Sequence, residues 1–210
     1  MNKTTTLLHI DASPRGTRSR SRTLGRDFLA AWAEAHPDGR IVTRDVGHEP
    51  PPLVTESWVE GAFAPAAQQS SAARAAIAVS DHYVDELLSS DMLVITTPIY
   101  NLSLPASLKA WIDQIVRVGR TFGLGTAGFE GLARNKRALI LVSSGSDFRP
   151  GTPGNAYNFL EPYLRAVLGF IGITDVKFIY AHSQNQADTV GAEAYREARA
   201  ELDTLARTAA

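Results

Sequence analysis

Hydroxyl and guanidinium side chains gather in one segment near the start of the chain. The segment 11–22 reads Asp-Ala-Ser-Pro-Arg-Gly-Thr-Arg-Ser-Arg-Ser-Arg, which places four hydroxyls and four arginines together. It precedes a predicted helix, and a helix N-terminus offers unpaired N–H groups and positive partial charge to an anion. Arginine adds a fork of donors. The segment could enclose a phosphate; the alternative is that Ser19 or Ser21 caps the helix while the arginines are solvated.

The glycine spacing of this segment matches neither G-x-x-x-x-G-K-[ST] nor G-x-G-x-x-G. The sequence therefore indicates neither a P-loop nucleotide hydrolase nor a resident Rossmann dinucleotide.

A second segment, 97–102, reads Thr-Pro-Ile-Tyr-Asn-Leu and follows a predicted strand. Ile99, Tyr100 and Leu102 could cover a planar heteroaromatic ligand, while Asn101 and the backbone bond its edge. The alternative is a plain turn closed by Pro98 and Asn101.

A third segment, Ser143-Ser144-Gly145-Ser146, follows the next predicted strand and is small and rich in donors. Alone it is a turn. In a doubly wound sheet the ligand lies where the strand order reverses, and the loops after strands 1, 3 and 4 meet there. Together the three segments predict a phosphate cradle beside an aromatic slot, which a phosphorylated planar cofactor needs.

The elements that position these segments follow from the hydrophobic period. Short β-rich runs at 5–10, 40–45, 92–97, 137–142 and 175–180 alternate with amphipathic helical patterns. One helix is expected to begin near Ala66, and Pro105 suits the first position of another. The alternation predicts an α/β protein with a five-stranded parallel sheet, in a single domain over 1–210.

Two stretches do not fit the alternation, 46–65 with its three consecutive prolines and 120–135 with its four glycines. Connections this long are usually functional, so we expect at least one to help build a binding site or a subunit interface. Mobile surface insertions are the alternative.

Composition narrows the class of protein. The 210 residues are 44% hydrophobic and 20% charged, as in ordinary globular proteins. With 21 basic and 22 acidic side chains the net charge is −1, which favours neither nucleic acid nor an anionic membrane as a partner. No apolar run approaches the length of a membrane span or a signal peptide, so a cytoplasmic location is expected.

Other chemistries find little support. There is no cysteine for thiol chemistry, no G-x-S-x-G elbow, and the five histidines lack metal-ligand spacing, so no metal is expected. Asp113 could act as a general base, but we favour a solvated carboxylate or a local ion-pair partner. No side chain is assigned a catalytic role.

In combination, the motifs resemble those of the FMN-dependent NADH:quinone oxidoreductases, also called FMN-dependent NADH-azoreductases. This resemblance implies a flavodoxin-like fold, which is a three-layer α/β/α sandwich with a five-stranded parallel sheet of order 2-1-3-4-5. The resemblance covers nearly the whole chain. It rests on Ser13, Ser19-Arg20-Ser21, Pro98 to Leu102, Leu108-Lys109, Trp111-Ile112-Asp113, Thr121-Phe122 and the segment 168–174.

The resemblance implies a role for each segment. Ser13 and Ser19-Arg20-Ser21 are expected to hold the FMN phosphate. The isoalloxazine and ribityl parts are expected to lie against Ile99, Tyr100, Asn101, Leu102, Ser143, Ser144, Gly145 and Ser146. Phe122 and Phe148 are expected to line the substrate pocket, and the family implies a homodimer with the flavin at the interface.

The implied reaction is ping-pong, in which NADH reduces FMN and leaves before a quinone or azo compound takes the electrons. The flavin does the difficult chemistry, so no side-chain nucleophile is required. Alternatives are an electron carrier, which the net charge of −1 does not favour, and a non-catalytic flavin-binding regulatory protein. No ribose-reading motif is recognisable, so NADH and NADPH both stay open.

Some positions depart from the family pattern. Arg20 stands where glutamine is common, and Ser144 and Ser146 replace the arginine and glycine of a common Ser-Arg-Gly-Gly loop. Leu102 and Leu124 occupy positions that are often aromatic. We hypothesise that losing these aromatic rings loosens the acceptor slot.

Overall fold

Five parallel strands form the central sheet of the computed structural model, which describes residues 4–126, 128–186 and 188–208. The strands are β1 (Thr6–Asp11), β2 (Arg40–Asp45), β3 (Met92–Pro98), β6 (Arg137–Ser143) and β7 (Asp175–Ala181), and they lie in the order β2-β1-β3-β6-β7. Counted along the chain among themselves, this is the order 2-1-3-4-5. The predicted fold class and sheet order are therefore confirmed.

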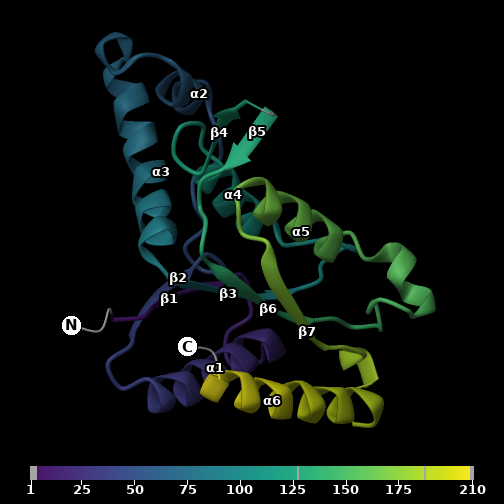
Figure 1. The fold of residues 1–210 in the computed structure, drawn as a ribbon. Helices are drawn as coiled ribbons and strands as arrows, with labels where there is room; N and C mark the ends of the chain where they lie inside the picture. Colours follow the sequence, from purple (N-terminus) through teal and green to yellow (C-terminus); the bar gives the residue numbers. More distant parts are fainter. Residues whose placement is uncertain (1–3, 127, 187, 209–210) are drawn as a thin grey trace.

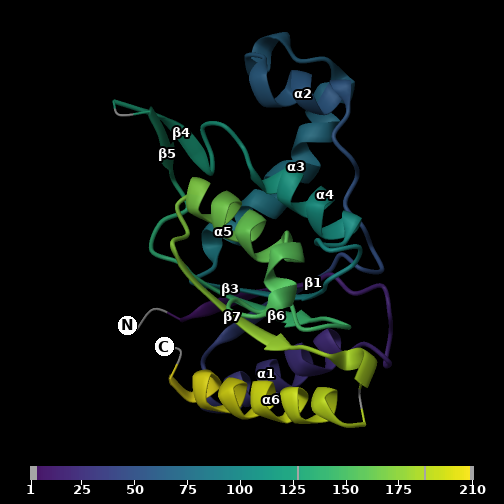
Figure 2. The same ribbon diagram turned by 90° about the vertical axis from the view of Figure 1, so that its right-hand side faces the viewer.

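Helices cover both faces of the sheet, as Figures 1 and 2 show. On one face lie α1 (Arg20–Ala35) and α6 (Val190–Thr208), and on the other α3 (Ser71–Ser89), α4 (Ala106–Ile115) and α5 (Leu160–Phe170). Leu7 packs with Phe28 and Trp32 on the first face, while Leu8 packs with Trp111 on the second. Successive strand residues point to opposite faces, so a sheet covered twice needs apolar residues at both.

The predicted strands end one residue too early at four of the five positions. The structure adds Asp11, Pro98, Ser143 and Ala181, and Pro98 pairs in register with Ser143. The apolar period gave no signal at Asp11, Pro98 or Ser143 because these residues are polar or lack an N–H. They form the edge from which the candidate site is built.

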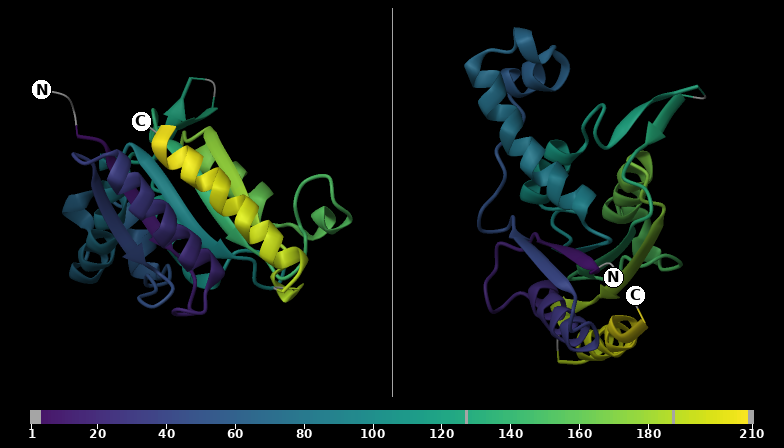
Figure 3. Two further views of the ribbon diagram at one scale, coloured as in Figure 1. Left: turned by 90° about the horizontal axis from the view of Figure 1, so that it is seen from below. Right: turned by 60° about the vertical axis from the view of Figure 1, so that its left-hand side comes forward.

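Both long connections contain regular structure that the sequence analysis missed. The first holds α2 (Glu56–Phe63), capped by Thr55, and the indole N–H of Trp58 donates to Oε1 of Gln114 on α4 at 2.8 Å. The second holds an antiparallel hairpin of β4 (Phe122–Gly125) and β5 (Gly128–Gly131). Both elements lie at the end of the molecule away from α1 and α6 (Figure 3). Their short length and glycine content hide them from a periodicity test.

Two helix starts differ from the prediction. Only a short 3₁₀ turn (Ala66–Gln68) forms near Ala66, and α3 begins at Ser71 because the Ser70 hydroxyl accepts the N–H of Ala73. Pro105 immediately precedes α4 instead of beginning it, since its ψ of 147° is extended. Within the described residues, none of the helices could cross a bilayer.

Candidate functional site

The loop between β1 and α1 gathers buried hydroxyls at the N-terminus of α1. Ser19 caps the helix, with its Oγ accepting the N–H of Arg22 at 3.3 Å, and the Ser21 Oγ lies 3.2 Å from it. Ser13 is also buried, and its own N–H donates to Oδ1 of Asp11 at 3.2 Å. Capping by Ser19 is thus confirmed, and it places the hydroxyls beside the unpaired N–H groups of the first turn.

This loop forms one wall of a cavity of about 650 Å³. The other walls come from the ends of β3 and β6 and from the 3₁₀ turn Gln184–Gln186 that follows β7. The cavity therefore lies at the carboxyl edge of the sheet, at the predicted reversal of strand order between β1 and β3. Its described lining is Ser13, Arg15, Thr17, Arg18, Ser19, Arg20, Ser21, Thr23, Pro98, Ile99, Tyr100, Ser143, Ser144, Gly145, Gln184 and Asn185.

Most of the predicted cofactor-binding residues meet at this cavity. They come from three segments far apart in the sequence, as the strand order requires. Five predicted residues do not line it, namely Asn101, Leu102, Ser146, Phe122 and Phe148. Seven lining residues were not proposed as ligands: Arg15, Thr17, Arg18, Thr23, Pro98, Gln184 and Asn185. The last two follow the fifth strand, so the rule that strand ends share one edge could have found them.

A strained turn follows β3. Asn101 and Leu102 have φ angles of 48° and 72°, in the left-handed region that leucine rarely adopts. The backbone of Tyr100 and Ser103 exchanges two hydrogen bonds of 2.9 and 3.0 Å across these residues. Positive φ at both central positions is the signature of a type I′ turn. The turn is therefore held in a conformation that local preference alone disfavours.

The loop after β6 is fixed by its neighbours. The Ser144 hydroxyl donates to the carbonyl of Ser146 at 2.7 Å, and the N–H of Asn185 donates to the carbonyl of Gly145 at 3.1 Å. A Cβ added to Gly145 would stand 2.7 Å from the Asn185 side chain, so glycine permits the close approach of the two loops. The Ser146 side chain does not line the cavity, although its backbone holds Ser144.

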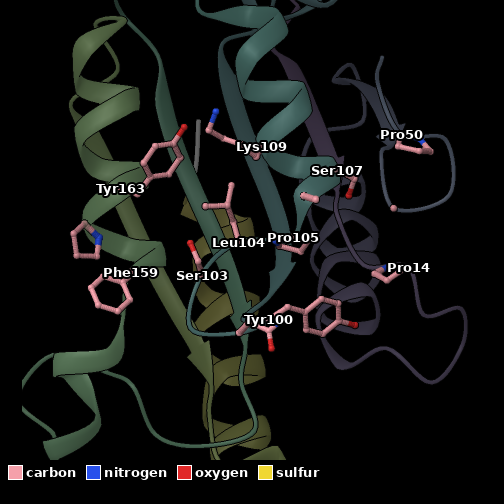
Figure 4. Close-up of a pocket in the computed structure, with 14 residues that line it drawn as sticks. Pro14, Pro50, Tyr100, Ser103, Leu104, Pro105, Ser107, Lys109, Phe159 and Tyr163 are labelled. Carbon is pink, nitrogen blue, oxygen red and sulfur yellow. The ribbon is translucent and has the colours of Figure 1, made fainter. Parts of the chain in front are cut away.

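An apolar groove of about 1020 Å³ lies on the other side of Tyr100 (Figure 4). Tyr100 and Asn101 line it together with Leu104, Phe159 and Tyr163. Figure 4 shows the helices that carry Lys109 and Tyr163 facing one another across the groove. Tyr100 thus separates a donor-rich cavity from an apolar one.

The two phenylalanines predicted for the substrate pocket lie away from both cavities of their own chain. Phe122 belongs to β4 and packs against Phe170 and Phe129, with ring centroids 4.7 and 6.1 Å away. Phe148 lies in the loop after β6, where its carbonyl accepts a hydrogen bond of 3.0 Å from Asn158. Within one chain, their assignment to the substrate pocket stays a prediction.

The arginines of the first loop divide into two groups. Arg15, Arg18 and Arg20 line the cavity, and the guanidinium of Arg20 lies 5.2 Å from the ring centre of Tyr195. Arg22 lies outside the lining and pairs instead with carboxylates. The described lining contains no carboxylate, so the cavity suits an anion.

The pKa values of both carboxylates beside Arg22 are shifted. Burial alone would raise the pKa of Asp45, but hydrogen bonds from Arg22 and His48 outweigh it and lower the pKa to about 2. Burial raises the pKa of Asp11, against the opposing effects of the Ser13 N–H and Arg22. Arg22 thus compensates two acidic groups beneath the loop.

Other candidate chemistry is accounted for locally. Asp113 pairs with Lys109 one turn earlier on α4 at 2.5 Å, which confirms the ion-pair reading of that carboxylate. Among the described residues, no three metal-ligating side chains come close enough to hold an ion.

Known proteins resemble this chain in both fold and sequence. A family model for the flavodoxin-like fold matches residues 5–205. The chain is 48% identical over 209 residues to the FMN-dependent NAD(P)H:quinone oxidoreductase 1 of Pseudomonas aeruginosa, covering 97% of this chain and 99% of that protein. It is 47% identical over 202 residues to the FMN-dependent NADH:quinone oxidoreductase of Nostoc punctiforme, covering 96% and 98%. A solved azoreductase from Bacillus anthracis superimposes with a TM-score of 0.90 at 28% identity, covering 97% of this chain and 99% of its own.

Proposed function

Because this chain belongs to the flavodoxin-like family of FMN-dependent NADH:quinone oxidoreductases, we propose that it is an enzyme of that kind, a single-domain cytoplasmic protein that binds FMN. It transfers two electrons from NADH to quinones and reductively cleaves aromatic azo compounds to amines by a ping-pong mechanism. An azo bond needs two such rounds, because its cleavage to two amines takes twice the electrons that a quinone takes.

The observation that carries this proposal is the donor-rich cavity at the carboxyl edge of β1, β3 and β6. Buried hydroxyls, the first turn of α1 and three arginines line it, and carboxylates are absent from its described lining. This donor set fits a phosphate monoester. The volume of about 650 Å³ lies within the usual range of cofactor pockets. The residues present therefore fit FMN.

Each part of the cofactor has protein groups suited to it. Ser13, Ser19 and Ser21, with Arg20 beside them, would hold the phosphate. The segments Ile99–Leu102 and Ser143–Ser146 would hold the ring system and the ribityl chain, with backbone donors and acceptors at the ring edge. The strained turn at Asn101 and Leu102 presets this edge before the ligand arrives.

Bound FMN would supply the redox chemistry, accepting a hydride from NADH and returning two electrons to the acceptor that replaces it. The protein orients the planar partners and limits access of water. Tyr100 is 37% exposed, so its ring can contact a ligand without moving out of a packed core. No described side chain is assigned as a nucleophile or a proton donor.

A homodimer completes the proposal. Leu124 and Phe129 of the hairpin are 82% and 72% exposed, and Phe63 of α2 is 68% exposed. Large apolar side chains exposed in this way mark interaction surfaces. A second copy that covers them would bring Phe122 and its neighbours toward the partner's flavin site, which gives that residue the pocket role it lacks within one chain.

The experiment that tests the function is anaerobic. The protein is loaded with FMN, NADH is added, and the loss of the oxidised flavin absorbance is followed; a benzoquinone is then added, and later an azo dye. We expect bleaching by NADH and recovery with either acceptor. Steady-state velocities should give parallel double-reciprocal lines, as a ping-pong sequence requires.

The remaining outcomes separate the alternatives. Failure to bind FMN contradicts the cavity assignment. Binding without bleaching favours a regulatory flavoprotein, and slow bleaching with fast exchange to a protein partner favours an electron carrier. Bleaching that only NADPH produces would change the donor but not the mechanism.

A further inference from the structure

Arg22 belongs to the arginine-rich loop, yet its guanidinium lies beneath the loop and not in the cavity. Its neighbours Ser21 and Thr23 both line the cavity, and Arg22 does not. Its Nη2 donates to the carbonyl of Ser13 at 2.6 Å, and its Nε donates to the carbonyl of Arg15 at 3.2 Å. The side chain therefore fixes the backbone on both sides of Pro14.

Two carboxylates hold the guanidinium in this orientation. Asp45, the last residue of β2, accepts from Nη1 at 2.6 Å and from Nη2 at 3.0 Å, a bidentate pair. Asp11, the last residue of β1, lies 3.0 Å from Nη1. All three guanidinium nitrogens are thus engaged by oxygens of this chain. A planar fork with five donors can make these contacts at once, whereas a lysine ammonium cannot.

We propose that Arg22 is a positioning residue for the FMN phosphate: held by Asp45, it shapes the backbone of the Ser13–Arg15 cradle and neutralises Asp11, without contacting the phosphate itself. This inference rests on the proposed function. It distinguishes Arg22 from Arg15, Arg18 and Arg20, which line the cavity.

The charge of Asp11 explains why such a residue is needed. Asp11 is 3% exposed and its Oδ1 accepts the N–H of Ser13, so a carboxylate lies directly under a cradle meant for an anion. Two negative groups close together in a poorly solvated place repel each other. Arg22 supplies the opposite charge from below, which keeps the cradle favourable to phosphate.

The test compares two flavins that differ only in the phosphate. Apoprotein is titrated with FMN and, separately, with riboflavin, and quenching of flavin fluorescence gives each dissociation constant. In Arg22→Gln we expect FMN to bind roughly tenfold more weakly, because the cradle loses its backbone support and the positive charge that offsets Asp11, with riboflavin changed by less than about twofold. A merely structural role would weaken both flavins equally, and that result would overturn the proposal.

A second variant, Asp45→Asn, keeps the test decisive. Asp45→Asn keeps the arginine at position 22 but removes the carboxylate that orients its guanidinium. We expect this variant to bind FMN more weakly and riboflavin as the wild type does. If Arg22 instead contacts the phosphate, freeing it should leave FMN binding equal or tighter, which contradicts positioning. Asp45→Asn also serves if Arg22→Gln does not fold.

The matched control is Arg26→Gln, one turn further along α1, where the guanidinium is exposed and pairs only with Asp27 at 3.4 Å among its described contacts. Both flavins should bind it as they bind the wild type. Failure of wild-type protein to bind FMN would instead count against the proposed function, so the two failures are distinguishable.

Discussion

At the scale of single residues, Leu102 carries the clearest mark of a functional constraint. A leucine at a φ of 72° costs about 1 to 3 kcal/mol, and such residues persist where the surroundings enforce them. Here the N–H of Phe159 donates to its carbonyl at 3.0 Å, and the Tyr100 and Ser103 backbones close the turn. The side chain is 38% exposed and lines neither cavity of its own chain, so its influence on a bound acceptor stays a prediction.

Replacing Leu102 with phenylalanine tests whether this position selects the acceptor. An added ring contributes about 0.5 to 1.5 kcal/mol of stacking beyond area burial, so the ratio of kcat/KM for a naphthoquinone over a benzoquinone should rise roughly 2- to 10-fold. Steady-state kinetics with both quinones measure it, and FMN affinity should stay constant because the backbone φ is unchanged. An unaltered ratio would refute the hypothesis.

His9 is a buried histidine that the proposed reaction does not use. It is 4% exposed, its Nε2 lies 3.1 Å from the Thr96 hydroxyl, and its Nδ1 has no hydrogen-bond partner within the described chain. Burial and then the nearby charge of Arg22 lower the pKa of His9 from 6.5 to about 4. The folded protein therefore keeps this imidazole neutral at a pH where an unfolded chain would protonate it.

This difference predicts an acid-dependent loss of stability. Above pH 6.5 neither state binds the proton; between pH 6.5 and 4 only the unfolded state does, so the free energy of unfolding falls as pH decreases through that window. Between pH 7.5 and 5 the loss from His9 should be about 2 kcal/mol. Urea unfolding of wild type and His9→Gln at both values measures it. Between pH 7.5 and 5 the free energy of unfolding of the variant should fall by about 2 kcal/mol less than that of the wild type. Equal decreases in the two proteins would contradict the lowered pKa of His9.

At the scale of elements, the loops after β1 and β2 support each other next to the site. The N–H of Gly47 donates to the carbonyl of Asp11 at 3.0 Å, and a Cβ at Gly47 would stand 2.3 Å from the carbonyl oxygen of Ser13. Both contacts are with backbone carbonyl groups, which cannot move aside as the end of a flexible side chain can. Contact between these two loops thus depends on the absence of a side chain at this position.

Gly47→Ala should therefore disturb the site through its neighbouring loop. We expect a loss of about 1 to 3 kcal/mol in the free energy of unfolding, as for overpacking in a tight site, together with weaker FMN binding. Gly16→Ala is the control, because a Cβ there meets nothing within 4 Å in the same loop. Thermal unfolding of the two apoprotein variants measures the loss of stability, and titration with FMN measures the loss of binding. Equal behaviour of the variants would show that the loop contact is unimportant.

At the scale of the whole molecule, the apolar surface is unevenly distributed. Leu53, Phe63, Leu124 and Phe129 are all more than two-thirds exposed, and they come from the two long connections. α2 and the hairpin both lie at the end of the molecule away from α1 and α6 (Figure 3). This end is where a second copy would bury most apolar area.

A charge placed on the hairpin tests the dimer. Leu124→Glu should lower the mass measured by light scattering from twice the 22.7 kDa of the chain toward that of one chain, because an unpaired carboxylate would be buried at the contact. FMN reduction by NADH should fall with it. Val190→Glu, at the start of α6, is the control and should remain dimeric. A wild type that is already monomeric, or a dimeric Leu124→Glu, would rule this surface out.

The sequence by itself determined the layers and the edge on which the site lies. Alternation of apolar strands with amphipathic helices follows from burial and hydrogen bonding within each element, so the parallel sheet and three of the loops could be predicted. The strand order followed from the resemblance of the motifs to a family with a flavodoxin-like fold. Local capping by Ser19 was equally accessible. α2 and the hairpin escaped because they are short and are held by tertiary contacts, such as the bond from Trp58 to Gln114.

Only the tertiary structure decided which way each side chain of the first loop points. Arg20 and Arg22 are chemically identical and two residues apart, yet one lines the cavity and the other is turned beneath it. The difference comes from Asp45, which is close to Arg22 only because β2 lies beside β1 in the sheet. A local pattern predicts where donors gather, but the direction of each donor depends on partners that are distant in sequence.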